Sequence, residues 1–224
     1  MSKREKQHSL YSDWINEKKY ENFVYDGILN YSIWENYSPK VLFLLKESTN
    51  DFKNIAEQKI DIRQGSGNHF WWNICYWKYL IEQLYKNKNP EFINKDNLPE
   101  VKYNNHILDS IAYVNIKKNC ENKNSSKDKD IFQYAINDKS LLVEQIDLIN
   151  PNVIFCSDIT FKSYKHLYPD NLKMINTTCY NHNNRLIINF RHPGFFQIEG
   201  GRERNFYDLK KQLTESNIFT NFRW

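Results

Sequence analysis

The sequence predicts an α/β fold: a three-layer α/β/α sandwich whose central, mainly parallel sheet has four strands. Four short apolar runs, each bounded by polar or turn-forming residues, predict the strands at residues 41–45, 111–114, 153–156 and 186–190. Unbroken apolar runs of this length are typical of strands buried on both faces. Helical patterns separate the runs, and strands that alternate with helices indicate a parallel sheet covered on both sides.

The composition indicates one globular domain. With 224 residues, the chain can bury one good hydrophobic core, so we expect a single domain over residues 1–224. An aromatic content of 16% argues against disorder, because so much apolar surface offsets the entropy lost on ordering. The formal charge of +4 is mild. It permits binding to a polyanion without establishing it, because acidic residues are interleaved with the basic ones.

The cysteines lie far apart and include no C-x-x-C spacing, which argues against a zinc or iron–sulfur site. Cys179 and His182 form one ligand-like pair, but no second pair accompanies them. We find no signal-peptide pattern and no apolar run near the roughly 20 residues that cross a bilayer. We expect a cytoplasmic protein, a monomer, with no cofactor and no membrane contact.

The chain begins with a charged segment, residues 1–8, which we expect to be frayed. An amphipathic helix is predicted over residues 9–23, and a short segment, residues 27–37, leads to Pro39 and the first strand. The loop after that strand runs to Gly67. A helix that packs against the sheet is predicted by a stripe with steps of three and four residues: Phe70, Ile74, Trp77, Ile81 and Leu84.

The second half of the chain contains three more predicted helices. Residues 119–130, between the second strand and the next helix, are polar and are expected to form a mobile loop. That helix has Asp138 as its expected N-cap and Pro151 as its stop, and another helix is predicted over residues 157–167. The last helix is predicted from the apolar spacing of Phe206, Leu209 and Leu213.

Polar side chains follow three of the four strands. Glu47 follows the first strand, Asn115 the second and His192 the fourth. The carboxyl ends of parallel strands lie at one edge of a sheet, where open α/β sheets bind ligands, so we expect these residues to converge. Each has a structural alternative: Glu47 could pair with Lys46, Asn115 could cap a turn, and His192 could be a loop histidine with satisfied hydrogen bonds.

Four segments in this order resemble the uracil-DNA glycosylase superfamily over roughly residues 41–206: VLFLLKE, AYVNIKK, LLVEQIDLINPNVIF and INFRHPG. The resemblance implies a glycosylase-like α/β/α domain that flips a pyrimidine out of DNA. It implies that Glu47 positions water or stabilises the sugar cation and that Asn115 reads the base. His192 would support the departing base. A carboxylate and an imidazole then act where charge develops.

Two departures from the superfamily pattern shape the expected substrate. Asn137 and Asp138 stand where cluster-bearing members have a cysteine, so no iron–sulfur cluster is expected. Uracil-specific members carry Gly and Pro in the first motif, whereas KESTND has neither. We therefore expect a wider polar pocket for a modified cytosine, hydroxymethylated or glucosylated, as in relatives that act on hypermodified phage DNA. Its substrate-binding residues would be Lys46, Ser48, Asn50 and Asp51.

A monofunctional DNA glycosylase that leaves an abasic site needs no metal, but it must hold a flipped base and grip DNA. Phe70 or Trp71 is expected to stack on the base. Phe195 and Phe196 are expected either to wedge into the duplex or to anchor their loop in the protein. Phosphate contacts are expected from the basic residues around this edge: Lys117, Lys118, Arg191, Arg202 and Arg204.

Other functions compatible with the same crevice remain open. One is ordinary uracil-DNA glycosylase activity in base excision repair. A second is a nucleoside or nucleotide hydrolase that does not bind DNA. A third is a non-catalytic protein that binds modified DNA. Salt dependence separates DNA enzymes from nucleoside hydrolases, because phosphate contacts make affinity fall as salt rises.

Overall fold

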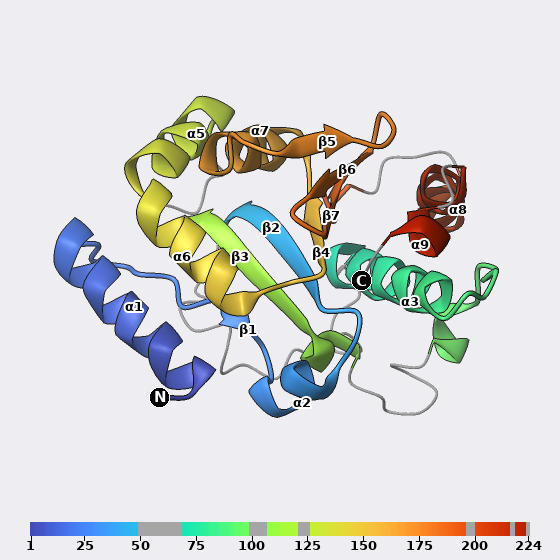
Figure 1. The fold of residues 1–224 in the computed structure, drawn as a ribbon, viewed down its shortest axis with the longest axis horizontal. Coiled ribbons are helices and arrows are strands. Elements are labelled where there is room, and N and C mark those ends of the chain that lie inside the picture. The colour runs from blue at the N-terminus through green and yellow to red at the C-terminus, as the bar shows by residue number, and fades with distance from the viewer. Residues whose placement is uncertain (49–68, 99–106, 121–125, 196–199, 216–217, 223–224) are drawn as a thin grey trace.

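The computed structural model describes residues 1–48, 69–98, 107–120, 126–195, 200–215 and 218–222. These residues form a seven-stranded sheet in the order β1-β3-β2-β4-β7-β6-β5 (Figure 1). Four strands run parallel at its centre: β3 (Ile111–Lys117), β2 (Val41–Glu47), β4 (Val153–Cys156) and β7 (Arg185–Asn189). Three short strands pair antiparallel at its sides: β1 (Gly27–Ile28), β6 (Cys179–His182) and β5 (Leu172–Met174).

The expected α/β class is confirmed, but the expected four-stranded sheet is wrong in its number of strands. The four predicted apolar runs are the four parallel strands, each buried over most of its length. The other three strands are short, and β5 and β6 are partly exposed. Strands of this kind need no unbroken apolar run, so a search for such runs finds only the parallel centre.

Alternate side chains of the parallel strands enter two hydrophobic cores, one on each face of the sheet. Val41, Phe43 and Leu45 of β2 belong to the first core, while Leu42 and Leu44 belong to the second. The helices of the first core are α3 (His69–Tyr85), α8 (Gly201–Thr214) and α9 (Ile218–Asn221). Those of the second core are α1 (Lys3–Lys18), α2 (Tyr31–Asn36), α5 (Asp128–Asn137), α6 (Lys139–Ile149) and α7 (Asp158–Leu167). Figure 1 shows α3 and α6 on opposite sides of the central strands.

The helices follow the predicted stripes and stop signals. Along α3 the predicted stripe is buried except at its first residue, Phe70, which is partly buried against the first core. Helix α6 ends at Asn150 in the left-handed conformation, directly before Pro151, and α7 begins with a capping box on Ser157. In the described part of the chain, no helix is long and apolar enough to cross a bilayer.

Residues 1–8 differ from the frayed segment that their charge indicated. Helix α1 begins at Lys3, because Ser2 and Glu5 form a capping box. Gln7 is 1% exposed, and its amide donates a hydrogen bond to the backbone oxygen of Asp26. This tertiary contact orders the first turns, and the helix expected over residues 9–23 starts earlier and ends at Lys18.

The expected mobile loop over residues 119–130 also differs from the structure where it is described. Cys120 donates its backbone N–H to Asn22, and residues 128–130 already belong to α5, a helix that was not predicted. Asp138 stands at the N-cap position of α6 but makes no capping bond. Its carboxylate instead accepts hydrogen bonds from the indole of Trp14 and the hydroxyl of Tyr20, tying α6 to the N-terminal segment.

Candidate functional site

Glu47, the last residue of β2, lies at the carboxyl edge of the sheet and is covered by the segment that leads into α5. Its two carboxylate oxygens accept hydrogen bonds from Ser126, one from the backbone N–H at 2.5 Å and one from the hydroxyl at 2.7 Å. Nζ of Lys117 lies 3.6 Å from Oε2, and only 7% of the Glu47 side chain is exposed. The carboxylate is therefore held in place by hydrogen-bond donors from outside its own strand.

Lys46 pairs with Asp128 across the same edge, with 2.9 Å between Nζ and Oδ1, and not with Glu47. The positive charge of Lys46 also acts on His192. Burial of the imidazole and, second, the Lys46 ammonium lower the pKa of His192 below its ordinary value. Both effects disfavour the charged ring and so favour the neutral imidazole.

The loop after β7 fixes the orientation of His192. The backbone N–H of Phe195 donates to the backbone oxygen of His192 at 2.9 Å, which closes a tight turn. The N–H of Gly194 donates to Nδ1 of His192 at 3.1 Å. A neutral imidazole that accepts at Nδ1 carries its proton on Nε2, so Nε2–H is the donor left for a ligand. A Cβ on Gly194 would lie 3.1 Å from Nδ1, so the turn has little room for a larger residue here.

Two aromatic side chains from the first turn of α3, Phe70 and Trp71, lie beside His192. The ring centroids of Phe70 and His192 are 5.8 Å apart. The rings of Trp71 and Phe70 pack in a T-shaped arrangement, with 4.8 Å between their centroids. The Trp71 ring also packs against the ring of Tyr113 in β3, with 6.0 Å between the ring centroids. Both predicted stacking residues therefore lie at the edge where His192 lies, with Phe70 in contact with the imidazole.

Asn115 lies inside β3 and not in the loop after it, because β3 extends to Lys117. It is 2% exposed, and both its backbone N–H and its side-chain amide donate to Oδ2 of Asp26, at 2.7 Å and 3.1 Å. Asp26 Oδ1 accepts from Lys118 at 2.5 Å and from Gln145 at 2.9 Å. The amide of Asn115 is thus oriented by a buried carboxylate that the sequence did not reveal.

The placement of Lys118 corrects its predicted role as a phosphate ligand. Its side chain is fully buried, its ammonium is bonded to Asp26, and it lies 5.2 Å from the ring centre of Trp14. Burial lowers the pKa of Lys118, while Asp26 opposes that shift. Lys117 is also largely buried, beside Glu47 and Ser126, and its Nζ donates to the Ser126 hydroxyl at 3.0 Å. These lysines hold the site together from inside and do not present their charges to solvent.

The remaining basic residues lie on or next to α8. Arg191 pairs with Asp208 at 2.8 Å and donates to Asn205 at 3.2 Å. Arg202 contacts Nδ1 of His69 at 3.0 Å, which links α8 to the start of α3. Arg204 is exposed. Among the predicted phosphate ligands, Arg204 is thus the one that the structure places on the open surface.

The remaining predicted site residues are Ser48, Asn50, Asp51, Phe195 and Phe196. Phe195 is 44% exposed, so its side chain is not a buried anchor of the loop, and its expected role as a wedge stays a prediction. Ser48 follows β2 directly and is partly exposed. Asn50, Asp51 and Phe196 lie outside the described residues.

No three His, Cys, Asp or Glu side chains of the described residues are grouped closely enough to hold a metal ion. Cys179 and His182, the ligand-like pair in the sequence, do not act together. Cys179 is buried in the first core, whereas His182 bonds through Nδ1 to the hydroxyl of Tyr164, a residue of the second core, at 2.7 Å.

No protein-family model, curated protein or solved structure matches this chain. The assignment of a function therefore rests on the residues at the carboxyl edge and on their geometry.

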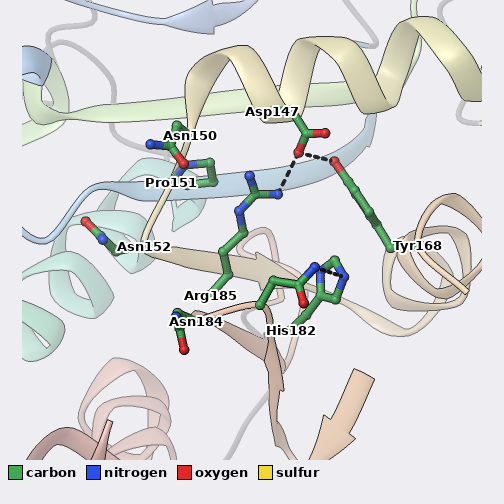
Figure 2. A pocket seen from close by; sticks show the side chains of 9 residues that line it. Asp147, Asn150, Pro151, Asn152, Tyr168, His182, Asn184 and Arg185 are labelled. Carbon is green, nitrogen blue, oxygen red and sulfur yellow. Dashed lines mark hydrogen bonds and ion pairs between the residues drawn. The ribbon is translucent and has the colours of Figure 1, made fainter. Parts of the chain in front are cut away.

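A separate polar cavity of about 580 Å³ lies at the opposite edge, between the amino ends of β4 and β7 (Figure 2). Arg185 and Tyr168 both bond to Asp147, at 2.7 Å and 2.9 Å. His182 is held between Tyr164 and Asn183, and burial followed by the charge of Arg185 lowers its pKa. The bonded groups thus form two sets, one around Asp147 and one around His182.

Two residues of the carboxyl edge were missed by sequence reasoning. Asp26 precedes Gly27, and Asp–Gly is ordinarily an exposed turn signal, so its burial is invisible in the sequence. Ser126 lies in the polar run that was expected to be mobile. Nothing in its neighbours indicates that the segment folds back over Glu47.

Proposed function

We propose that this chain is a monofunctional DNA glycosylase of the uracil-DNA glycosylase type, acting in the cytoplasm as a monomer on a modified cytosine. The observation that carries the proposal is the His192 turn, because it supports a neutral imidazole with Nε2–H as the available donor beside an aromatic ring. Glu47 is the carboxylate at the end of β2, separated from β7 by β4 alone. Two strand spacings put β2 and β7 about 10 Å apart, which is on the scale of one nucleoside.

The chemistry assigned to this pair is hydrolysis of the bond between C1′ of deoxyribose and N1 of the base. As the bond breaks, positive charge develops on the sugar and negative charge on the base. The carboxylate of Glu47 stabilises the sugar cation and orients a water molecule, whose oxygen adds to C1′ while one of its protons passes to the carboxylate and from there to solvent. His192 donates Nε2–H to an oxygen of the departing base, which leaves as an anion and is later protonated by solvent.

The expected preference for a modified cytosine is supported by the residues after β2 and by Asn115. The amide of Asn115 donates to Asp26, so its orientation is fixed and its oxygen is the group left to accept a hydrogen bond from a base. An acceptor complements the 4-amino group of cytosine. KESTND offers further polar groups for a hydroxyl-rich substituent, and such sites discriminate strongly against bases that leave them unpaired.

The test is alkaline strand scission of matched oligonucleotides that contain uracil, cytosine, 5-hydroxymethylcytosine or its glucosylated form. We expect scission of the glucosylated or hydroxymethylated DNA, with little scission of uracil DNA. Preferential scission of uracil DNA would contradict the modified-cytosine preference and indicate a uracil-DNA glycosylase of base excision repair. Binding without scission of any DNA, or hydrolysis of free nucleosides that is insensitive to salt, would exclude a glycosylase.

Variants make the test specific to the proposed pair. Glu47→Gln and His192→Ala are each expected to lower abasic-site formation at least about a hundredfold, the usual scale for one lost charge-stabilising group. Glu144→Gln and His8→Ala are the matched controls, because both side chains are exposed and neither takes part in the hydrogen bonds described for the site. A chelator is expected to leave activity unchanged. Loss of activity that zinc or magnesium restores would contradict the mechanism.

A further inference from the structure

A buried asparagine on α3 is bonded to the turn that carries His192. Asn73 is 3% exposed and lies on a helix whose neighbouring positions are apolar. Its side-chain amide donates to the backbone oxygen of Pro193 at 2.6 Å and to that of Phe195 at 3.2 Å. A buried amide is costly unless its hydrogen bonds are made, so the two carbonyls are specific partners of Asn73.

The two carbonyls are placed so that Asn73 controls the donor to His192. The C=O of Pro193 and the N–H of Gly194 belong to one planar peptide unit and point in opposite directions. Holding that carbonyl on Asn73 therefore holds the Gly194 N–H on Nδ1 of His192. The bond to Phe195 secures the other end of the same turn, whose N–H closes onto the His192 carbonyl.

Helix α3 acts on both sides of the imidazole. Phe70, three residues before Asn73 and so on the same side of the helix, packs against the His192 ring. The ring is thus positioned by one side chain of α3, and its hydrogen bond is oriented by another.

We propose that Asn73 is a positioning residue for His192, holding the Pro193–Gly194 peptide so that the imidazole keeps its proton on Nε2. The inference rests on the proposed function only in that His192 acts on the departing base. It identifies a residue that does not touch the substrate and acts through the orientation of another residue.

The main test uses Asn73→Asp, which keeps the shape of the side chain but removes both N–H donors. The carboxylate would face two carbonyl oxygens and repel them, so the peptide turns and the Gly194 N–H leaves Nδ1. The ¹⁵N NMR shifts of the His192 ring nitrogens at pH 7.5 report the tautomer directly. We expect the Nε2–H form in the natural protein and a mixture with the Nδ1–H form in the variant.

The kinetic test separates positioning from binding. We expect kcat to fall about ten- to a hundredfold, the scale of a small misplacement of a catalytic group, while KM for DNA changes little. The ratio of variant to natural activity should rise as pH falls, because the introduced carboxyl group regains one donor when it is protonated. A folded variant with the natural tautomer and the natural kcat would overturn the proposal.

Matched variants distinguish a specific effect on His192 from a general loss of stability. Asn176→Asp is the control, because Asn176 also donates its amide to a backbone carbonyl, that of Gln212 at 2.9 Å, away from His192. We expect it to keep the His192 tautomer and kcat. If Asn73→Asp does not fold, Asn73→Ser is used in its place. Serine keeps one donor on a shorter side chain, so we expect a smaller fraction of the Nδ1–H tautomer than in Asn73→Asp. Because the NMR measurement needs no substrate, it decides the role of Asn73 even if no DNA is cleaved.

Discussion

Ser126 bonds to both oxygens of the Glu47 carboxylate, through its backbone N–H and through its hydroxyl. The proposed catalytic carboxylate is therefore held by a residue from the segment before α5. We expect Ser126→Ala to lower kcat about tenfold, because it removes one hydrogen bond to a charged group and leaves the other. Glu47→Gln should cost at least about ten times more. Equal rates for Ser126→Ala and the natural protein in single-turnover assays would show that the bond does not orient Glu47.

The pH dependence of activity should follow His192. Burial and Lys46 lower the pKa of His192, so the neutral ring persists below its ordinary range, and activity falls only when the pH drops through this lowered pKa. Lys46→Met removes the positive charge and raises the pKa of His192, so the acid limb of kcat moves to higher pH. Lys173→Met, an exposed lysine of β5, is the control and should leave the profile unchanged. An acid limb that moves down in Lys46→Met contradicts this assignment.

Phe195 should matter more for duplex than for single-stranded substrate. An exposed apolar wedge helps to unstack a base pair, and a single strand does not need that step. Phe195→Ala is expected to reduce kcat/KM on duplex DNA by about tenfold or more and on single strands by much less. Met174→Ala, which changes another exposed apolar side chain, is the control. Equal losses on the two substrates would indicate a structural role for Phe195.

The ion pair of Asp26 and Lys118 should be important for stability, because both side chains are fully buried. Removing one partner leaves the other charge unpaired, and we expect Lys118→Met to lower the free energy of unfolding by about 3–5 kcal/mol. The double variant Asp26→Asn with Lys118→Met should lose less free energy of unfolding than the sum of the losses in the two single variants. Glu35→Gln, which breaks a partly exposed pair with Lys3, should cost no more than about 1 kcal/mol in the same urea titrations.

The parts of the fold that could be predicted are those whose local sequence is determined by burial. Residues 41–45 and 153–156 are apolar because both faces of the sheet are covered, and the α3 stripe is apolar because one face packs on the sheet. Helix α5 was missed because only Ile131 and Ala135 of its residues are buried. The start of α1 was missed although Ser2 and Glu5 have the capping-box spacing, because the charges of residues 1–8 outweighed that signal; the contact of Gln7 with Asp26 is distant in the sequence.

The candidate site was predictable only in part, for the same reason. Glu47 ends one parallel strand and His192 follows another, so the topology alone predicts the edge on which they lie. Asn73 could not be found, because an asparagine within an apolar helix gives no indication of its partner. Lys117 and Lys118 both follow the predicted strand, residues 111–114, and the sequence did not show that Asp26 lies beside Lys118.

The closed outer side of β3 limits how this chain can assemble. Residues 23–28 run along that side: β1 pairs with Ala112 and Tyr113, and Asp26 accepts the N–H of Asn115. Farther along, Val24 donates to the carbonyl of Lys118. The backbone groups most able to recruit a strand from a second molecule are thus already bonded. The opposite border of the sheet is β5, only three residues long, so concentrated protein should resist strand-to-strand aggregation at both borders.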